Sequence, residues 1–223
     1  PYVAIYSTFL QRAYDNVLHD VCLNELPVVL CIDRAGFVGG DGETHQGIYD
    51  VGYLGSMPNM SIFAPKDSEE LKSVIQWSQN FSKPIAIRYP KSEVSFEYGK
   101  TAPIEYRKWE RLVDANSNIT LISNGDVLTN VYKAARTLGN LEVKVNVINA
   151  RFIKPIDVTM LSNFTKDDTL FIFEEYTSSN SIYSQVLEFF NKSECYAKVY
   201  GVNVENKPYA VASREELIAS VGL

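Results

Sequence analysis

The sequence predicts an α/β protein with two doubly wound, mainly parallel sheets. Short apolar runs alternate with longer stretches in which apolar residues recur at helical spacing, which is typical of β-α-β units with right-handed crossovers. The run at 28–32 is continuously apolar, as in a strand buried on both faces of a parallel sheet. The pattern lapses between about 91 and 118. We therefore expect two series of elements, 1–95 and 117–223, joined by a linker at 96–116 with room for edge strands.

The first series begins with an apolar strand at 2–6. Ser7 and Thr8 then offer a helix cap, and apolar residues follow at helical spacing. Pro65 ends a later strand, and the acidic stretch 67–70 places negative charge near the positive end of the next helix. The expected strands of this series are 2–6, 28–32, 60–64 and 84–87, and its expected helices are 8–25, 49–54 and 67–80.

The second series repeats this order of elements. Glu174 and Glu175 close one of its strands, where they either line a second crevice or, on the simpler interpretation, lie at a solvated strand end. The expected strands are 119–123, 143–148, 169–173 and 197–202, and the expected helices are 125–138, one following 155–157, 181–190 and 214–221.

The composition excludes several classes of protein. With 46% hydrophobic and 22% charged residues the chain is typical of soluble globular proteins, and a net charge of -6 without a basic stripe argues against nucleic-acid binding. No apolar run approaches the roughly 18 residues that a membrane span needs. Cys22, Cys31 and Cys195 form no C-x-x-C pair, which favours a reducing cytosol. The chain opens at Pro1 in strand-like sequence, so we expect it to be part of a longer protein.

A glycine-rich loop at 33–47 is the strongest candidate for a functional site. Five of the chain's 12 glycines fall between Gly36 and Gly47, and this density indicates a backbone that visits positive φ and approaches something closely. A structurally demanding turn would have the same composition. However, the loop leaves the C-terminal end of strand 28–32, and that edge is where open α/β sheets bind ligands.

Three strand ends are expected to bring Tyr6, Arg34 and Arg88 to this edge. Two arginines there favour an anionic ligand, because the guanidinium fork matches phosphate and carboxylate geometry. The alternative is that each arginine pairs with a nearby acid such as Asp33 or Asp41.

Asp41 and His45 are candidates for proton transfer, since a carboxylate commonly orients an imidazole that acts as a general acid or base. As metal ligands they lack a third partner at a suitable spacing, so no metal site is assigned. Gly40, Asp41 and Gly42 match the opening of the magnesium-diphosphate motif of thiamine enzymes, but the asparagine pair that completes the motif is absent from the sequence. His19, the other histidine, is expected on a polar helix face.

The sequence resembles the 1-deoxy-D-xylulose-5-phosphate synthase family over essentially the whole chain. Asp-Gly-x-Thr-His-Gln at 41–46 fits any transketolase-like enzyme, whereas Asp-Arg-Ala-Gly at 33–36 and Arg-Tyr-Pro at 88–90 indicate the narrower family. The resemblance implies part of a transketolase pyrimidine-binding domain at 1–95 and a transketolase-type C-terminal domain at 117–223. The segments that carry it are 6–15, 33–36, 40–47, 58–60, 64–67, 88–90, 151–157, 174–175 and 222–223.

The resemblance implies a transferase that uses thiamine diphosphate and Mg²⁺. Such an enzyme decarboxylates pyruvate and joins the two-carbon unit to glyceraldehyde 3-phosphate, in the methylerythritol phosphate route to isoprenoid precursors and towards thiamine and pyridoxal. The resemblance implies that Phe9 stacks on the cofactor, with Arg12 beside it. It implies that Arg34 and Arg88 bind the phosphate of the acceptor. The residues expected at the reacting centre are Tyr6, Asp41 and His45, with His45 positioned for proton transfer.

The resemblance also implies parts that lie outside this chain. In the family, a preceding domain holds Mg²⁺ and the diphosphate, and a preceding glutamate activates the aminopyrimidine. We therefore expect the N-terminal half of the enzyme as a partner, a homodimer, a bacterial cytoplasmic or plastid location, and an inactive chain when it is alone. The alternatives are another transketolase-like enzyme (a transketolase or a 2-oxoacid dehydrogenase β subunit) and a non-catalytic scaffold. Departures from the family at 176–181 and 209–213 are expected to alter loops of the second domain and to leave the crevice unchanged.

Overall fold

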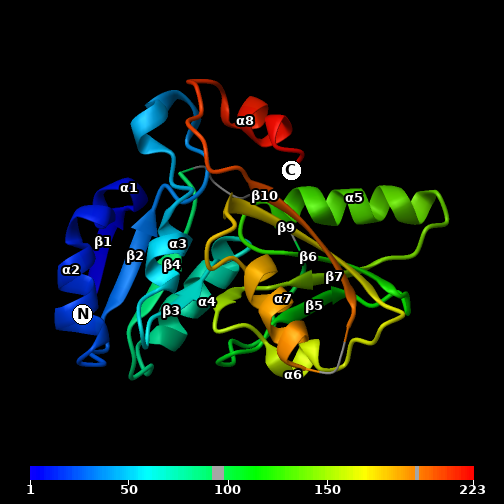
Figure 1. The fold of residues 1–223 in the computed structure, drawn as a ribbon, viewed down its shortest axis with the longest axis horizontal. Coiled ribbons are helices and arrows are strands. Elements are labelled where there is room, and N and C mark those ends of the chain that lie inside the picture. Colours follow the sequence, from blue (N-terminus) through cyan, green and yellow to red (C-terminus); the bar gives the residue numbers. More distant parts are fainter. Residues whose placement is uncertain (92–97, 194–195) are drawn as a thin grey trace.

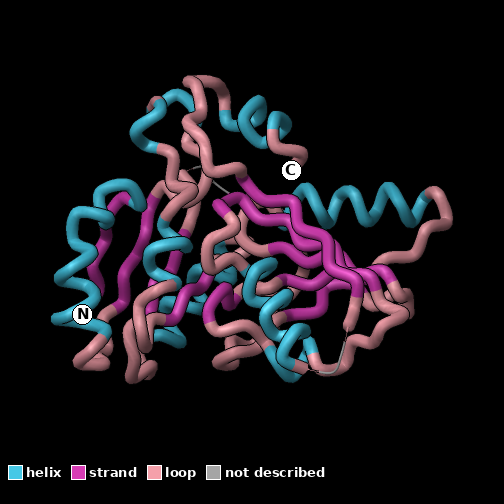
Figure 2. Tube along the Cα trace, in the orientation of Figure 1, coloured by secondary structure: helices cyan, strands magenta, loops and turns pink. Residues whose placement is uncertain are grey.

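The computed structural model describes residues 1–91, 98–193 and 196–223, and within these ranges the strands form two five-stranded sheets (Figure 1). Figure 2 shows them as two separate groups of strands with helices around both. The predicted α/β class with two mainly parallel sheets is confirmed. The predicted boundary between residues 95 and 96, and Cys195, lie outside the described residues.

The first sheet has the order β1-β2-β4-β3-β8. Neighbouring strands are parallel except for β8, which comes from the second half of the sequence and pairs antiparallel with β3. Phe152 of β8 packs edge-on against Phe63 of β3, with ring centroids 4.9 Å apart. The strands are β1 (Tyr2–Tyr6), β2 (Val29–Asp33), β4 (Ile85–Arg88), β3 (Ser61–Phe63) and β8 (Phe152–Lys154).

The second sheet has the order β10-β9-β6-β7-β5. Its edge strand β5 lies inside the predicted linker and pairs antiparallel with β7. Residues alternate between the two faces, so that Ile122 and Ile148 join the core shared with α7 and the first sheet, whereas Leu121 and Val147 pack with α5 and α8. The strands are β5 (Glu110–Val113), β6 (Ile119–Ser123), β7 (Asn146–Asn149), β9 (Thr169–Thr177) and β10 (Lys198–Val204).

The helices follow the predicted positions, with one difference in type. The expected helix at 8–25 is a continuous helical stretch at 7–22 that changes from α to 3₁₀ to α and ends in a π-helix. Asp67 caps α4, because its carboxylate accepts a hydrogen bond from Glu70 N at 2.7 Å. The α-helices are α1 (Ser7–Leu10), α2 (Tyr14–Asn16), α3 (Asp50–Gly55), α4 (Ser68–Ser78), α5 (Leu128–Asn140), α6 (Val158–Leu161), α7 (Ile182–Lys192) and α8 (Arg214–Ser220).

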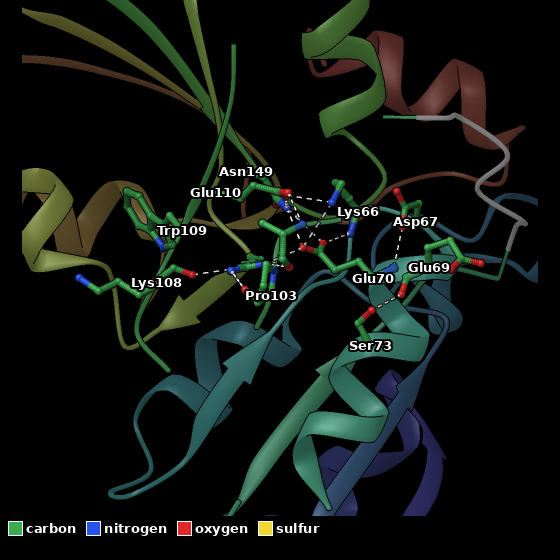
Figure 3. Close-up of polar contacts among 12 residues, drawn as sticks. Lys66, Asp67, Glu69, Glu70, Ser73, Pro103, Lys108, Trp109, Glu110 and Asn149 are labelled. Atoms are coloured by element: carbon green, nitrogen blue, oxygen red, sulfur yellow. Dashed lines mark hydrogen bonds and ion pairs between the residues drawn. The ribbon is translucent and has the colours of Figure 1, made fainter. Parts of the chain in front are cut away.

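A buried polar cluster joins the two halves of the molecule (Figure 3). Lys66, just before α4, donates a 2.8 Å hydrogen bond to Glu110 of β5 and lies 3.6 Å from Glu70. Asn149 at the end of β7 donates to both glutamates, and Arg151 donates to Pro103 O at 2.7 Å. Because these charges are buried and paired across the junction, the cluster fixes the two sheets relative to each other.

Candidate active site

The C-terminal ends of three parallel strands lie side by side at one edge of the first sheet. Tyr6 is opposite Asp33 in the register of β1 and β2, and Ile32 is opposite Arg88 in the register of β2 and β4. The strand order therefore places Tyr6, Arg34 and Arg88 at the same edge, where the glycine-rich loop also starts.

Six of the predicted site residues form one continuous set of contacts, which we call the site cluster. The Tyr6 and Phe9 rings are stacked with centroids 5.1 Å apart, and the His45 ring meets Phe9 edge-on at 5.8 Å. A cation covers each end of the stack: the guanidinium carbon of Arg34 lies 3.9 Å from the Tyr6 centroid and that of Arg12 lies 5.3 Å from the Phe9 centroid. Asp41 is the sixth member, with a carboxylate oxygen 3.9 Å from Arg34 Nε.

Acidic side chains hold Arg34 in place. Its Nη1 donates to the Asp33 carboxylate, and its backbone adopts a left-handed conformation with φ of 58°, which turns the side chain back over Tyr6. Arg34 remains partly exposed, with 23% of its side chain open to solvent. An anionic ligand could therefore reach this guanidinium from the solvent side.

The hydrogen bonds of Asp41 and His45 differ from the predicted carboxylate-imidazole pair. Among the described residues, Asp41 accepts from Lys91 Nζ at 2.6 Å, and His45 Nδ1 pairs with Thr44 Oγ1 at 3.0 Å. The bond from Lys91, together with the nearby Arg34 charge, lowers the pKa of Asp41. Among the described residues this carboxylate thus lies beside two cations and has no hydrogen bond to the imidazole.

Arg88 is buried beneath the loop and is bound on several sides. Its Nε and Nη2 donate to the two Asp50 oxygens at 3.0 and 3.1 Å, and Nη2 also donates to Gly47 O at 3.3 Å. The Tyr176 ring, from the second half, lies 4.9 Å from its guanidinium carbon. Burial lowers the pKa of Arg88, but the Asp50 carboxylate more than offsets this and the pKa is raised.

Sequence reasoning missed Asp50 and Tyr176. Asp50 starts a short helix three residues after the loop, and an acid at a helix start is usually explained by the helix dipole alone. Tyr176 lies far along the chain in β9, and no local pattern connects it with Arg88. Both are buried, with exposures of 1% and 0%.

The glycines close the loop by direct backbone contact. Gly36 and Gly47 exchange two hydrogen bonds of 2.8 Å as an isolated antiparallel bridge. A Cβ at Gly47 would lie 2.0 Å from Arg34 O, so a side chain at position 47 is excluded. At Gly47 the close approach that the glycine density predicts is therefore one between backbone segments of the loop itself.

The interpretation of Glu174 and Glu175 as a solvated strand end is wrong. Both are buried, with exposures of 1% and 7%, and each accepts hydrogen bonds from within the protein, as buried carboxylates usually do. Glu174 accepts from Ile182 N at 2.7 Å, and Glu175 accepts from Phe37 N at 2.8 Å.

The two segments that depart from the family contact the first half of the chain. Asn180 Nδ2 donates to Gly52 O at 2.8 Å, and a Cβ at Gly39 would lie 3.5 Å from Ala212 O. The expectation that these departures leave the crevice untouched is therefore corrected: Tyr176 of the first segment lies against Arg88, and the segment 209–213 lies against the glycine-rich loop.

The donors present fit an aromatic ligand better than a metal ion. Phe9 keeps 40% of its surface exposed although Tyr6, His45 and Arg12 surround it, so part of its side chain is open to contact with an aromatic ligand. The described ranges contain no group of three or more His, Cys, Asp or Glu side chains that could hold a metal ion. Over the same ranges, no helix combines the length and the apolar character that crossing a membrane requires.

The two five-stranded sheets with their helices are those of a protein of the transketolase type. Residues 1–96 match the transketolase pyrimidine-binding domain, and residues 107–223 match the transketolase C-terminal domain. The chain belongs to the transketolase family. A solved structure described as "Split gene transketolase, inactive beta4 tetramer" has the same fold, with a TM-score of 0.89 at 22% identity over 100% of this chain and 72% of its own.

Within this family, the curated relatives named here are 1-deoxy-D-xylulose-5-phosphate synthases, as the resemblance implied. The Clostridium perfringens protein is 44% identical over 86% of this chain and 31% of its own length. The Clostridium tetani protein is 39% identical over 100% of this chain and 36% of its own length. The chain thus spans about a third of the length of these relatives.

Proposed function

We propose that this chain is the pyrimidine-binding and C-terminal part of a thiamine-diphosphate-dependent 1-deoxy-D-xylulose-5-phosphate synthase. The reaction would join the two-carbon unit of pyruvate to glyceraldehyde 3-phosphate with loss of CO₂, for isoprenoid precursor synthesis. The observation that carries the proposal is the site cluster, in which an exposed aromatic stack, two cations and an imidazole meet at one sheet edge. The relatives named above come from bacteria, which favours a bacterial cytoplasm over a plastid.

The proposed roles follow from exposure and chemistry. Phe9 stacks on the aminopyrimidine once Arg12, which lies over the ring in this structure, moves beside it. When bound, thiamine diphosphate supplies an electron sink that stabilises negative charge on the two-carbon unit. Arg34 holds the phosphate of the acceptor, and His45, next to Phe9, exchanges a proton with the acceptor carbonyl oxygen. Tyr6 supports both Phe9 and Arg34 by stacking.

Arg88 is the second candidate for phosphate binding. Among the described residues Asp50 and Gly47 accept from its Nε and Nη2, and these bonds leave the N–H groups of Nη1 for a phosphate oxygen. We therefore propose the partly exposed Arg34 as the main phosphate contact and the buried Arg88 as a further contact through Nη1.

The described residues contain no group of three or more metal-ligand side chains, and we propose that the remainder of a longer protein or a partner holds the Mg²⁺ and the diphosphate. The full enzyme is proposed to act as a homodimer. The chain alone, titrated calorimetrically with thiamine diphosphate and Mg²⁺, should show no submillimolar binding. Addition of the N-terminal part of the Clostridium perfringens relative should restore binding, and Phe9→Ala should weaken it again. Tight binding to the isolated chain would contradict this division of the site.

Arg34→Ala provides a test of substrate class in the reconstituted complex. Loss of one charge-assisted contact to phosphate should raise KM for glyceraldehyde 3-phosphate about 10- to 100-fold, with a small effect on kcat. Unphosphorylated glyceraldehyde is the control, since its KM should change little. The exposed Arg136→Gln on α5 is the matched control variant. Equal effects of Arg34→Ala on both aldehydes would contradict the phosphate role.

A further inference from the structure

The second half of the chain contacts the glycine-rich loop at Gly36, Phe37 and Gly39. In Figure 1 the segment leading into α8 runs beside the loop that follows β2. The Phe37 ring meets the Tyr209 ring edge-on at 5.0 Å, and a Cβ at Gly39 would lie 3.0 Å from Arg214 N. Two points of the loop therefore rest on the segment 209–214.

Glu175 makes the closest of these contacts. Its Oε1 accepts from Phe37 N at 2.8 Å, and its carboxyl carbon lies 2.5 Å from where a Cβ of Gly36 would be. Gly36 has φ of 81°, so both its conformation and the missing side chain serve this approach. The position of the carboxylate and the position of the loop are therefore coupled: neither can move towards the other, and separation breaks the bond to Phe37.

Arg214 holds the other side of this carboxylate. Its Nη2 donates to Glu175 Oε2 at 2.6 Å and lies 2.9 Å from an Asp126 oxygen. Among the described residues Arg88 is a third charge nearby, and with Asp126 and Glu175 it lines a cavity of about 10 Å³, room for about one water molecule. The charged groups that face Glu175 are thus Arg214, Asp126 and Arg88.

We propose that Glu175 is a positioning residue for the glycine-rich loop. Together with Arg214 it fixes the backbone at Gly36 and Phe37, and thereby sets where the loop presents Arg34, Asp41 and His45. The second half of the chain then holds the glycine-rich loop in position, although it supplies no residue to the site cluster. The effect of this positioning on catalysis rests on the proposed function. The contact between Glu175 and the loop does not, because it is present in this chain without cofactor or substrate.

The ionisation of Glu175 supports this assignment. Burial raises the pKa of Glu175 to about 7, while Arg214 and the Phe37 N–H act in the opposite direction. A carboxylate accepts a stronger hydrogen bond than a neutral carboxyl group does. The bond to Phe37 should therefore strengthen as the pH rises through about 7.

Nuclear magnetic resonance of the ¹⁵N-labelled chain can test the coupling without cofactor or substrate. The variants are Glu175→Gln, Arg214→Gln and, as the matched control, Arg136→Gln on the outer face of the second half. Three signals are followed: the Phe37 amide proton between about pH 5.5 and about pH 8.5, hydrogen exchange of the Gly36 and Gly47 amides, and the imidazole resonances. His19, which pairs with Asp15 on the surface, is an internal reference for His45.

In the unmodified chain the Phe37 amide should titrate with a midpoint near 7 and move downfield with rising pH. Glu175→Gln should abolish this titration. Both Glu175→Gln and Arg214→Gln should speed exchange at Gly36 and Gly47 on the order of 10- to 100-fold and shift the His45 resonances, with His19 unchanged. Arg136→Gln should change none of these signals.

Folded variants whose His45 resonances and loop exchange rates equal those of the unmodified chain would overturn the proposal. If Glu175→Gln does not fold, the same two signals in Arg214→Gln test the coupling. None of these signals depends on synthase activity, so a failed activity assay would leave this result standing.

Discussion

Gly47→Ala is expected to open the glycine-rich loop and to abolish the activity of the reconstituted enzyme. The new Cβ would lie 2.0 Å from the carbonyl oxygen of Arg34, and because the obstacle is backbone, no side-chain rotation relieves the clash. Separation of the two segments breaks the paired hydrogen bonds between Gly36 and Gly47. We expect the free energy of unfolding in urea to fall by about 3 kcal/mol.

Gly40→Ala is the matched control, because it lies in the same loop and its Cβ would have nothing within 4 Å. Its free energy of unfolding should stay within about 0.5 kcal/mol of the unmodified chain. Equal losses in the free energy of unfolding of the two variants would show that the loop is sensitive to any added side chain. That result would contradict the specific role given to the backbone contact at position 47.

Asp50→Asn is expected to destabilise the chain by about 3 to 5 kcal/mol, because it leaves the Arg88 charge buried without a counter-charge. The carboxylate is fully buried and accepts two hydrogen bonds from Arg88, and the amide that replaces it presents a donor to a donor. Chemical denaturation followed by fluorescence or circular dichroism measures the loss.

The double variant Asp50→Asn with Arg88→Met should recover part of this stability, since it removes the unpaired charge as well. Glu188→Gln on α7 serves as the control, because its pair with Lys192 is 63 to 73% exposed and should contribute nothing measurable. A loss in Asp50→Asn no larger than in Glu188→Gln would mean that the buried pair does not hold Arg88.

The elements of the fold were predictable because their signals are local. Apolar runs, the cap at Asp67 and the proline at Pro65 locate β3 and α4 to within one or two residues. The antiparallel edge strands β5 and β8 were not predictable as such, because their pairing depends on partners far away in the sequence. β8 joins the first sheet only through β3, more than 80 residues earlier in the chain.

The same distinction applies to the site. Strand ends and glycine density locate Tyr6, Arg34 and the loop, since these follow from β-α-β geometry. The contacts of Asp50, Tyr176 and Glu175 at the site could not be predicted from the local sequence. A charged residue at a helix start or strand end usually faces solvent, and only the folded chain brings Arg88 and Phe37 to them.

The most direct test of the central claim is product formation by the two parts together. The chain, mixed with the N-terminal part of the Clostridium perfringens relative, thiamine diphosphate and Mg²⁺, should release CO₂ from pyruvate in a manner that depends on glyceraldehyde 3-phosphate. Mass spectrometry should detect 1-deoxy-D-xylulose 5-phosphate. A stable, cofactor-loaded complex that makes no product, although the relative's own C-terminal part restores activity under the same conditions, would contradict the assignment of this site.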